Sequence, residues 1–493
     1  MVVFIKIVQL LLCLSILVIV HEFGHFIAAK IFKVRVEKFY LFFNPKFSIL
    51  RAKKIKGKWQ FKFFSKNVIN ERPKHDEDGN ILTDSKGRVI YEPTPIKELS
   101  DDNWGKYPET TEWGIGWVPL GGYVKIAGMI DESMDTEQLK QDPQKHEFRS
   151  KPAWQRLIIM LAGVIMNVIA AMVIYIGLLF TYGEMYLPTE NVKYGITVDS
   201  LGYEMGLRNG DRILSIDNEE VESFYKIPEV ILLEQASTIQ VLRDGEKVDI
   251  ALPQETIGKL VSAKEFFMSP RVPFIVGAFA EDSPAKEAGL ETNDRIIGIN
   301  DQYFDFFDEY RPELQKHKNQ DITLNVVRSN DTIDINMFLP ENALLGVYIT
   351  SAGVFDFAEK EYSFFQAIPA GCAKAFTGIS SYLKQLKLLF SPDVKAYESV
   401  GSFITIGSIF PGTWDWQAFW QLTAFISIIL AIMNLLPIPA LDGGHVIFTL
   451  YEMITGRKPS DRFLEIAQII GMLLIFALFA LAMWNDITRF IIK

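Results

Sequence analysis

The sequence predicts a polytopic α-helical membrane protein with about four transmembrane helices and a pair of repeated β-rich domains. The 493-residue chain is 49% hydrophobic, and its apolar residues gather in four long runs, as membrane spans require. Polar blocks separate these runs, and one block contains an internal repeat. The presence of two cysteines excludes a disulfide scaffold and a cysteine-based zinc site. A net charge of −10 argues against nucleic-acid binding.

The first transmembrane helix is predicted at residues 1–30 and carries ionisable side chains. Its apolar run, Ile7–Val20, is too short to cross a bilayer, which takes about 20 residues. The helix must therefore continue through His21, Glu22 and His25. Ionisable groups at membrane depth are costly and indicate a functional site. A secretory signal peptide is the alternative, but no small-residue cleavage site follows the apolar run.

Three further transmembrane helices are predicted, at residues 156–182, 417–445 and 463–486. Lysines and arginines concentrate beside the ends of the first two spans, which places residues 31–155 in the cytoplasm and both chain ends outside it. Residues 65–115 in this region are polar and rich in turn signals. They predict a cytoplasmic insertion without recognisable chemistry.

The extracytoplasmic block contains a repeat in which Glu204–Ile216 aligns with Glu287–Ile299, and seven of the thirteen aligned residues are identical. Each copy places a Gly-Leu turn and an Asp-Arg pair before an apolar strand. This pattern resembles the PDZ domain of bacterial envelope proteases. Two such modules are predicted, at residues 190–256 and 270–342.

An amphipathic helix is predicted at residues 363–390, because apolar residues recur there at spacings of three and four. Lys374, Lys384 and Lys387 interrupt any long uncharged span, so this helix is expected on the outer membrane surface. The alternative is a helix that packs on one of the repeated modules.

The ionisable residues of the first helix form the motif His-Glu-x-x-His. Residues four apart lie on one face of a helix, so the imidazoles of His21 and His25 can reach one metal ion. Glu22 can then act as the general base for a metal-bound water. A pair of core histidines bonded to the backbone is the alternative, but a buried Glu22 would also need a partner.

Two histidines leave a catalytic zinc one protein ligand short. A candidate at membrane depth lies in the stretch Asn434–His445, where two prolines break the third span and Asp442 precedes a Gly-Gly pair. Asp442 can complete a His/His/Asp site, and a helix-capping role is its alternative. Three ligands suffice, so a structural or substrate-side role is expected for His445.

The His-Glu-x-x-His motif in the first span, together with Asn-x-x-Pro-x-Pro-x-Leu-Asp-Gly-Gly in the third, resembles the site-2 protease family of intramembrane zinc metalloproteases. Two tandem PDZ modules narrow the resemblance to the regulator of sigma-E protease type. It covers nearly the whole chain except the insertion. The chain departs from the family at Leu41–Asn44, where a Gly-Phe-Gly turn is usual, so the geometry of this hairpin stays open.

The resemblance implies one Zn²⁺ per chain, bound by His21, His25 and Asp442, with Glu22 as catalytic base. It implies that Asn434 binds the substrate backbone or stabilises the oxyanion. It also implies a membrane re-entrant β segment that pairs with an unwound substrate strand; its substrate-binding residues would be Gly121, Gly122, Tyr123 and Val124. Gly163 and Asn167 match a further family pattern, which a small-residue helix contact would also explain.

The implied activity is intramembrane cleavage of single-span membrane proteins, either anti-sigma factors or signal-peptide remnants. A zinc-activated water would attack an unwound transmembrane segment, since a helical segment hides its peptide bonds. The implied location is the bacterial inner membrane, with the PDZ modules outside the cytoplasm and the active site near the cytoplasmic side. The PDZ pair would bind peptide C-termini or act as a size filter, and the filter is favoured because neither copy has a carboxylate-binding loop.

Two other functions compete with this interpretation. A membrane-anchored PDZ scaffold with an inactive metal site would have no need to bury Glu22, and metal content would separate it from an enzyme. A zinc protease of the prenyl-protein-processing type would take a downstream glutamate as its third ligand. Asp442 with its Gly-Gly pair argues against that type, and zinc retained by an Asp442→Asn variant would favour it.

Overall fold

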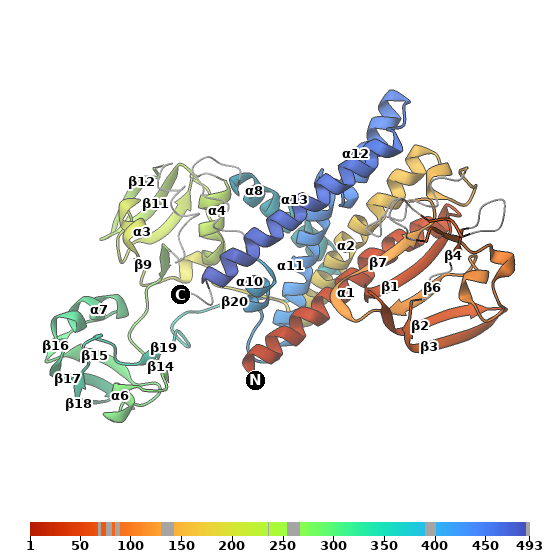
Figure 1. Ribbon diagram of the computed structural model, residues 1–493. Helices are drawn as coiled ribbons and strands as arrows, with labels where there is room; N and C mark the ends of the chain where they lie inside the picture. Colours follow the sequence, from red (N-terminus) through yellow and green to blue (C-terminus); the bar gives the residue numbers. More distant parts are fainter. Residues whose placement is uncertain are drawn as a thin grey trace. The chain divides into compact units, whose positions relative to one another are not determined.

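The computed structural model describes residues 1–67, 71–74, 81–83, 89–129, 142–234, 236–253, 267–389 and 401–489. Parts of the predicted ranges 65–115 and 190–256, and Phe390 at the end of the predicted amphipathic helix, lie outside the described residues. The chain divides into two compact units (Figure 1). The first unit contains Met1–Tyr182, the beginning of the helix that follows Tyr362, and the C-terminal part of the chain. The second unit contains Gly183–Glu361. Each unit is described by itself.

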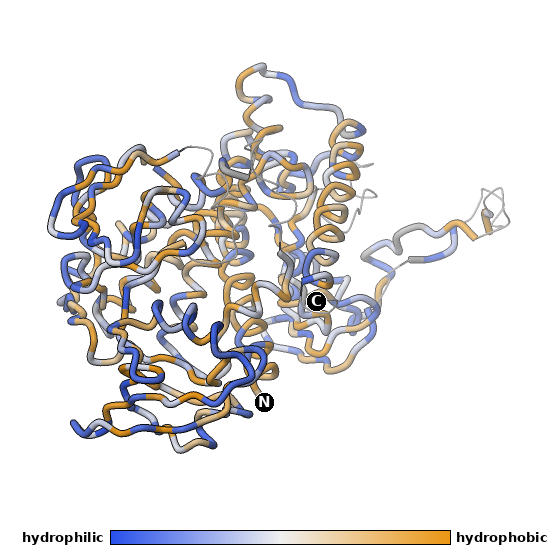
Figure 2. Tube along the Cα trace, turned by 90° about the vertical axis from the view of Figure 1, so that its left-hand side faces the viewer, coloured by the Kyte–Doolittle hydropathy of each residue, from blue (hydrophilic) through white to orange (hydrophobic). Residues whose placement is uncertain are grey.

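The first unit contains four helices that are long and apolar enough to cross a membrane. They are α1 (Val2–Ile31), α2 (Ala153–Tyr182), α11 (Trp416–Leu435) and α13 (Asp461–Ile487). Hydrophobic residues cover these helices along their length (Figure 2). α1 and α2 approach closely, because a Cβ atom on Gly24 would lie 2.4 Å from the carbonyl oxygen of Ala162. Small residues therefore bring the metal-site motif of α1 against α2.

The predicted range of the third span, 417–445, contains the break that its two prolines predict. α11 ends at Leu435, and a separate helix, α12 (Asp442–Thr455), begins at Asp442. Pro437 and Pro439 lie in the turn between the two helices and have no backbone N–H to continue α11. A Cβ atom on Gly443 would lie 2.2 Å from the carbonyl oxygen of Leu436, so only glycine fits this turn.

A five-stranded sheet follows α1 along the chain. Its strands are β1 (Val36–Phe43), β2 (Phe47–Ile55), β3 (Lys58–Lys66), β6 (Glu112–Ile115) and β7 (Val118–Ile126), in the order β3-β2-β6-β1-β7. β1 runs parallel to β6 and antiparallel to β7. β7 is therefore an edge strand, and it packs against α1. The end of the predicted insertion thus supplies a central strand, β6.

A buried ion pair joins the insertion to this sheet. Two nitrogens of Arg51 donate to the carboxylate of Glu112 at 2.9 and 3.0 Å, and the hydroxyl of Tyr40 donates to it at 2.6 Å. Burial acts to raise the pKa of Glu112, but the hydrogen bonds and charge of Arg51 outweigh it and hold this pKa below its ordinary value. The smaller elements here are β4 (Glu71–Pro73), which pairs with β5 (Tyr91–Pro93), η1 (Ile96–Glu98), η2 (Trp104–Lys106) and η4 (Phe148–Ser150).

The second unit contains two modules whose elements follow one order. The first module contains β9 (Ile196–Val198), α3 (Ser200–Glu204), β10 (Arg212–Ile216), α4 (Ile227–Leu233), β11 (Thr238–Arg243), β12 (Glu246–Ala251) and β13 (Met268–Pro270). The second contains β14 (Val276–Phe279), α6 (Pro284–Glu287), β15 (Arg295–Ile299), α7 (Phe307–Lys316), β17 (Gln320–Arg328), β18 (Asp331–Leu339) and β19 (Val347–Ile349). The pairing is also the same: β10-β11-β12 corresponds to β15-β17-β18, and β9-β13 corresponds to β14-β19. The last strand of each module, β13 or β19, lies beyond the end of its predicted range, 190–256 or 270–342.

One ion pair is present at the same place in both modules. Arg243 donates two hydrogen bonds to Asp211 in the first module, and Arg328 donates two to Asp294 in the second. Both aspartates are buried and belong to the Asp-Arg pair of the aligned sequence. The remaining elements of the unit are β8 (Glu184–Tyr186), which pairs with β20 (Ala358–Lys360), η5 (Thr189–Asn191), η6 (Phe224–Lys226) and β16 (Gln302–Tyr303).

The predicted amphipathic helix is α8 (Phe364–Leu389), and a short helix, α10 (Phe403–Ile409), precedes α11. The start of α8 packs on α2 through small residues, since a Cβ atom on Gly371 would lie 2.6 Å from the side chain of Ile176. Large apolar residues on another face of α8, such as Phe376, are exposed. Its place at a membrane surface stays a prediction.

Candidate metal centre

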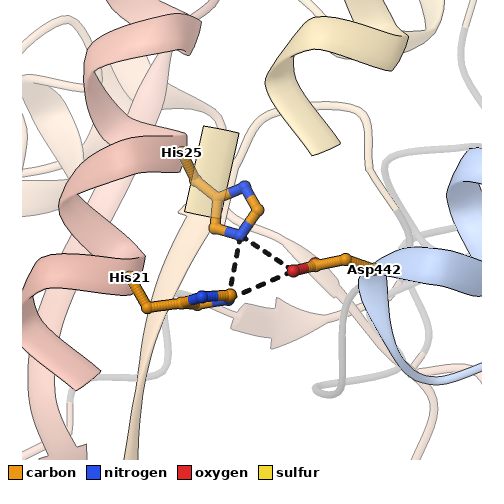
Figure 3. Close-up of side chains that lie close together, drawn as sticks. All are labelled: His21, His25 and Asp442. Carbon is orange, nitrogen blue, oxygen red and sulfur yellow. Dashed lines mark hydrogen bonds and ion pairs between the residues drawn. The ribbon is translucent and has the colours of Figure 1, made fainter. Parts of the chain in front are cut away.

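His21 and His25 lie one turn apart on α1, and Asp442 opens α12 (Figure 3). The Nε2 atoms of the two histidines are 3.2 Å apart. Oδ2 of Asp442 lies 3.1 Å from Nε2 of His21 and 3.3 Å from Nε2 of His25. Three potential ligand atoms from opposite ends of the chain therefore form a nearly equilateral triangle.

The size of this triangle fits zinc. Zinc bonds to histidine nitrogen and carboxylate oxygen at about 2.0–2.2 Å, so the ligand atoms of a tetrahedral site lie about 3.3 Å apart. The buried Oδ2 of Asp442 has no hydrogen-bond partner among the described residues. Such an oxygen needs a cation nearby. Asp442 does not cap its helix, because the cap position is Leu441.

The backbone of α2 fixes the tautomer of His25. Its Nδ1 lies 2.8 Å from the carbonyl oxygen of Ile159. A carbonyl only accepts, so Nδ1 carries the proton and donates it, which leaves the lone pair on Nε2 directed at Asp442. This is the tautomer that binds a metal through Nε2.

Asn167 of α2 contacts Nδ1 of His21, just as the carbonyl of Ile159 contacts Nδ1 of His25. Its side-chain amide nitrogen lies 3.3 Å from Nδ1 of His21, and its Oδ1 is buried without a partner in the described part of the chain. With the side-chain amide turned by half a rotation, Oδ1 would accept a hydrogen bond from the N–H at Nδ1 of His21. The lone pair of Nε2 then also faces the triangle.

The triangle lies in the wall of a cavity of about 730 Å³. Glu22 lines this cavity, together with Val124 of β7. The amide nitrogen of Asn434, at the end of α11, lies 3.4 Å from Nε2 of His21. The structure therefore brings every sequence-predicted site residue to one cavity; the four from β7 are Gly121, Gly122, Tyr123 and Val124. His445 also lines the cavity.

Sequence reasoning did not identify the side chains that support β7. The hydroxyl of Tyr123 donates to Oδ1 of Asn44 at 3.0 Å, and the amide nitrogen of Asn44 donates to Ser48 at 3.0 Å. Asn44 is the last residue of the segment that departs from the family's Gly-Phe-Gly turn. No pattern in the sequence predicted this contact, because the two residues are far apart in the chain and meet only through the sheet.

Comparison with known proteins places the chain among peptidases. The model of the family described as "Peptidase family M50" matches residues 9–66 and 102–478. The unmatched residues between these segments fall within the predicted insertion. The matched segments contain all the residues of the triangle and Glu22.

Curated relatives match over nearly the whole chain. A "Regulator of sigma E protease" from Haemophilus influenzae is 26% identical, over 97% of this chain and 98% of its own. A "Protease RseP" from Yersinia pestis is 25% identical, over 97% of both chains. A "Putative zinc metalloprotease" from Vibrio cholerae is 25% identical, over 98% of both chains.

Proposed function

The chain belongs to peptidase family M50 and is a membrane-embedded zinc metalloprotease of the site-2 protease type, and from this premise we propose that it hydrolyses peptide bonds within the transmembrane segments of single-span membrane proteins. The observation that carries the proposal is the shared cavity, in which the His21, His25 and Asp442 triangle, Glu22 and the strand β7 meet. A scaffold would need neither the triangle nor a glutamate beside it.

The proposed ligands of one zinc ion are Nε2 of His21, Nε2 of His25 and Oδ2 of Asp442. Their mutual distances of 3.1–3.3 Å and the orphaned oxygen of Asp442 support this assignment. Zinc bound there would act as a Lewis acid towards the scissile carbonyl and lower the pKa of water. Asn167 and the carbonyl of Ile159 hold the two imidazoles in the tautomer that zinc requires.

Glu22 is the proposed general base. It takes a proton from the attacking water and delivers it to the nitrogen of the leaving amine when the C–N bond breaks. Glu22 and Val124 of β7 line the same cavity, which supports a carboxylate beside the substrate-binding strand. Asn434 lies beside the proposed zinc ligands and is placed to donate its amide N–H to the oxyanion that forms from the scissile carbonyl.

β7 is the proposed substrate-binding strand. A transmembrane helix satisfies its own carbonyl groups, so the substrate must unwind before a peptide bond is accessible. An edge strand offers unpaired backbone groups to an extended peptide, and residues 121–124 of β7 line the cavity. This arrangement supports a re-entrant segment that binds the unwound substrate by strand addition.

The two modules of the second unit are proposed to be PDZ domains on the extracytoplasmic side. Their common element order and the repeated aspartate–arginine pair support a shared fold. We expect them to restrict substrates by the size of the extracytoplasmic domain. One relative is named a regulator of sigma E. The proposed substrates are anti-sigma factors or signal-peptide remnants, in a bacterial inner membrane with the active site near the cytoplasmic side.

The experiment compares detergent-purified wild-type protein with three variants, Glu22→Gln, Asp442→Ala and His445→Ala. Bound zinc and cleavage of a single-span membrane protein without a folded outer domain are both measured. The wild type should hold about one zinc per chain and cleave. Glu22→Gln should keep zinc and lose cleavage, Asp442→Ala should lose both, and His445→Ala should keep zinc.

Three outcomes would contradict the proposal. Wild-type protein that holds no zinc and cleaves none of a panel of single-span proteins would favour the scaffold function. Zinc retained by Asp442→Ala would move the third ligand elsewhere. Zinc lost from Glu22→Gln would show that Glu22 holds the site together in addition to any role as base.

A further inference from the structure

One face of the five-stranded sheet is open where the sheet reaches β3. The side chains of Trp59, Phe61 and Phe63 in β3 are 52%, 58% and 68% exposed. Side chains alternate along a strand, so these three point to the same face. A row of three large aromatic side chains differs from the scattered apolar residues of an ordinary soluble surface and marks a site of contact.

The opposite face of β3 contacts the segment around η2, although Gln60 on that face is exposed. The side-chain oxygen of Gln60 accepts a hydrogen bond of 2.9 Å from the indole N–H of Trp104, and the ammonium group of Lys62 lies 4.5 Å from the centre of the Trp104 ring. β3 therefore has one face packed against the segment around η2 and one aromatic face without cover among the described residues.

The open face is the one on which α1 lies. Phe61 is opposite Ala52 in β2, Ala52 is opposite Trp113 in β6, and Trp113 is opposite Phe39 in β1. Residues that oppose one another across strands share a face. Phe26 of α1 packs on Trp113 and Phe39, with ring centres 5.1 and 5.8 Å apart. Phe61 therefore lies on the same face of the sheet as the contact with α1.

The hairpin between β2 and β3 carries positive charge next to the aromatic row. Lys54, Lys56 and Lys58 are exposed, and Lys54 directly opposes Trp59. Tryptophan and lysine together are typical of the boundary between acyl chains and anionic headgroups. The apolar middle of the row lies further along β3, away from these lysines.

From these observations we infer that this aromatic face inserts into the bilayer leaflet around the C-terminal end of α1. Phe61 and Phe63 lie among acyl chains, Trp59 lies at headgroup level, and the hairpin lysines bind anionic phospholipid headgroups. Two arguments select lipid over a protein partner: the face is continuous with a membrane-spanning helix, and its lysines complement anionic lipid. The inference goes beyond proteolysis, since it concerns the sheet edge remote from the metal centre.

The test uses the full chain in nanodiscs of phosphatidylcholine and phosphatidylglycerol. With Cys13 and Cys372 replaced by alanine, a spin label is attached to a cysteine at Phe61 or, as the control on the opposite face, at Gln60. Accessibility to oxygen, which concentrates in lipid, is compared with accessibility to a water-soluble nickel chelate. The oxygen-to-nickel ratio should be severalfold higher for Phe61→Cys than for Gln60→Cys, and a label at Phe63 should repeat the result if the first variant does not fold.

Two results would overturn the inference. Equal, water-like ratios at both positions would leave the aromatic face in solvent. A label at Phe61 that is shielded from both reagents would mean that protein, including a second copy of the chain, covers it.

The lysines are tested by lipid exchange. In nanodiscs of phosphatidylcholine alone, the ratio at Phe61 should fall for the chain with its lysines and stay constant in a Lys54→Gln/Lys58→Gln background. An oxygen-to-nickel ratio that is the same with and without phosphatidylglycerol in both backgrounds would show that the lysines do not bind the headgroups.

Discussion

A Cβ atom on Gly163 would lie 2.4 Å from Nε2 of His25, closer than any side-chain atom can approach. The same atom would lie 2.8 Å from Nε2 of His21. The absence of a side chain at this position of α2 therefore makes the space in which both imidazoles face Asp442. Glycine is unfavourable inside a helix by about 1 kcal/mol relative to alanine, so its presence here needs such a reason.

We predict that Gly163→Ala abolishes zinc binding, because the added methyl group displaces both imidazole rings. Zinc per chain, measured on detergent-purified protein, checks this. Gly177→Ala is the matched control in the same helix, since no atom lies within 4 Å of the position of its Cβ atom. Full zinc content in Gly163→Ala would mean that the histidines bind no metal in the geometry described here.

Asn167 should act on zinc affinity through the oxygen of its side chain. We predict that Asn167→Ala weakens zinc binding by about 10- to 100-fold, because His21 loses the acceptor that fixes its tautomer. Competition with a chelator measures the change. Asn167→Asp retains an acceptor oxygen and should bind zinc more tightly than the alanine variant; equal weakening in both would assign Asn167 a packing role only.

Asn434 should affect the rate of cleavage without affecting the metal. Removal of one donor to an oxyanion costs about 10²- to 10³-fold in kcat, and we predict a loss of this size for Asn434→Ala. Its KM and zinc content should stay close to those of the wild type. Asn67→Ala, on another wall of the same cavity, is the control and should retain most of kcat. A raised KM with normal kcat would instead assign Asn434 to ground-state substrate binding.

The Arg51–Glu112 pair predicts a pH-dependent stability of the sheet. Both side chains are buried, and loss of one partner leaves a buried charge, so Glu112→Gln should destabilise the sheet by about 3 kcal/mol at neutral pH. The pKa of Glu112 is lower in the folded than in the unfolded protein. The unfolded state thus takes up the proton first, and the advantage of the wild type should be full above about pH 5 and disappear on further acidification.

Thermal unfolding of wild type and Glu112→Gln in detergent, at neutral pH and at a series of pH values from about 4 downwards, checks this prediction. The two midpoints should differ at neutral pH and approach one another in acid. A difference that is independent of pH would show that the loss comes from packing, and not from the ionised carboxylate.

The clustering of the proposed metal donors and the spans could be predicted because their signals are local or chemically rare. His21 and His25 form one short motif, and Asp442 is an isolated acid in an apolar stretch beside two glycines. The candidate spans follow from hydropathy alone, and all four are confirmed as helices of sufficient length. The roles of the site residues stay predictions until zinc and cleavage are measured.

Features that depend on distant pairing could not be predicted. β6 is only four residues long, and it lies between β1 and β2 although the insertion separates it from both along the chain. Its alternation of Trp113 and Ile115 is too short to reveal a central strand. α12 follows two prolines. Proline predicts the end of a helix but does not predict where the next helix begins. Asn167 was visible as part of a pattern, but its contact with His21 appears only when α2 packs on α1.

The place of Asp442 in the chain has a consequence for biosynthesis. The ribosome makes His21 and His25 first and Asp442 roughly 400 residues later, about 20 to 80 s at usual rates of elongation. Throughout that interval the nascent chain lacks the proposed third zinc donor, although α1 has already been made. With this ligand set, a hydrolase that is synthesised into the same bilayer as its targets would stay inactive until almost all of its chain exists, and a prematurely terminated product would not cleave its neighbours.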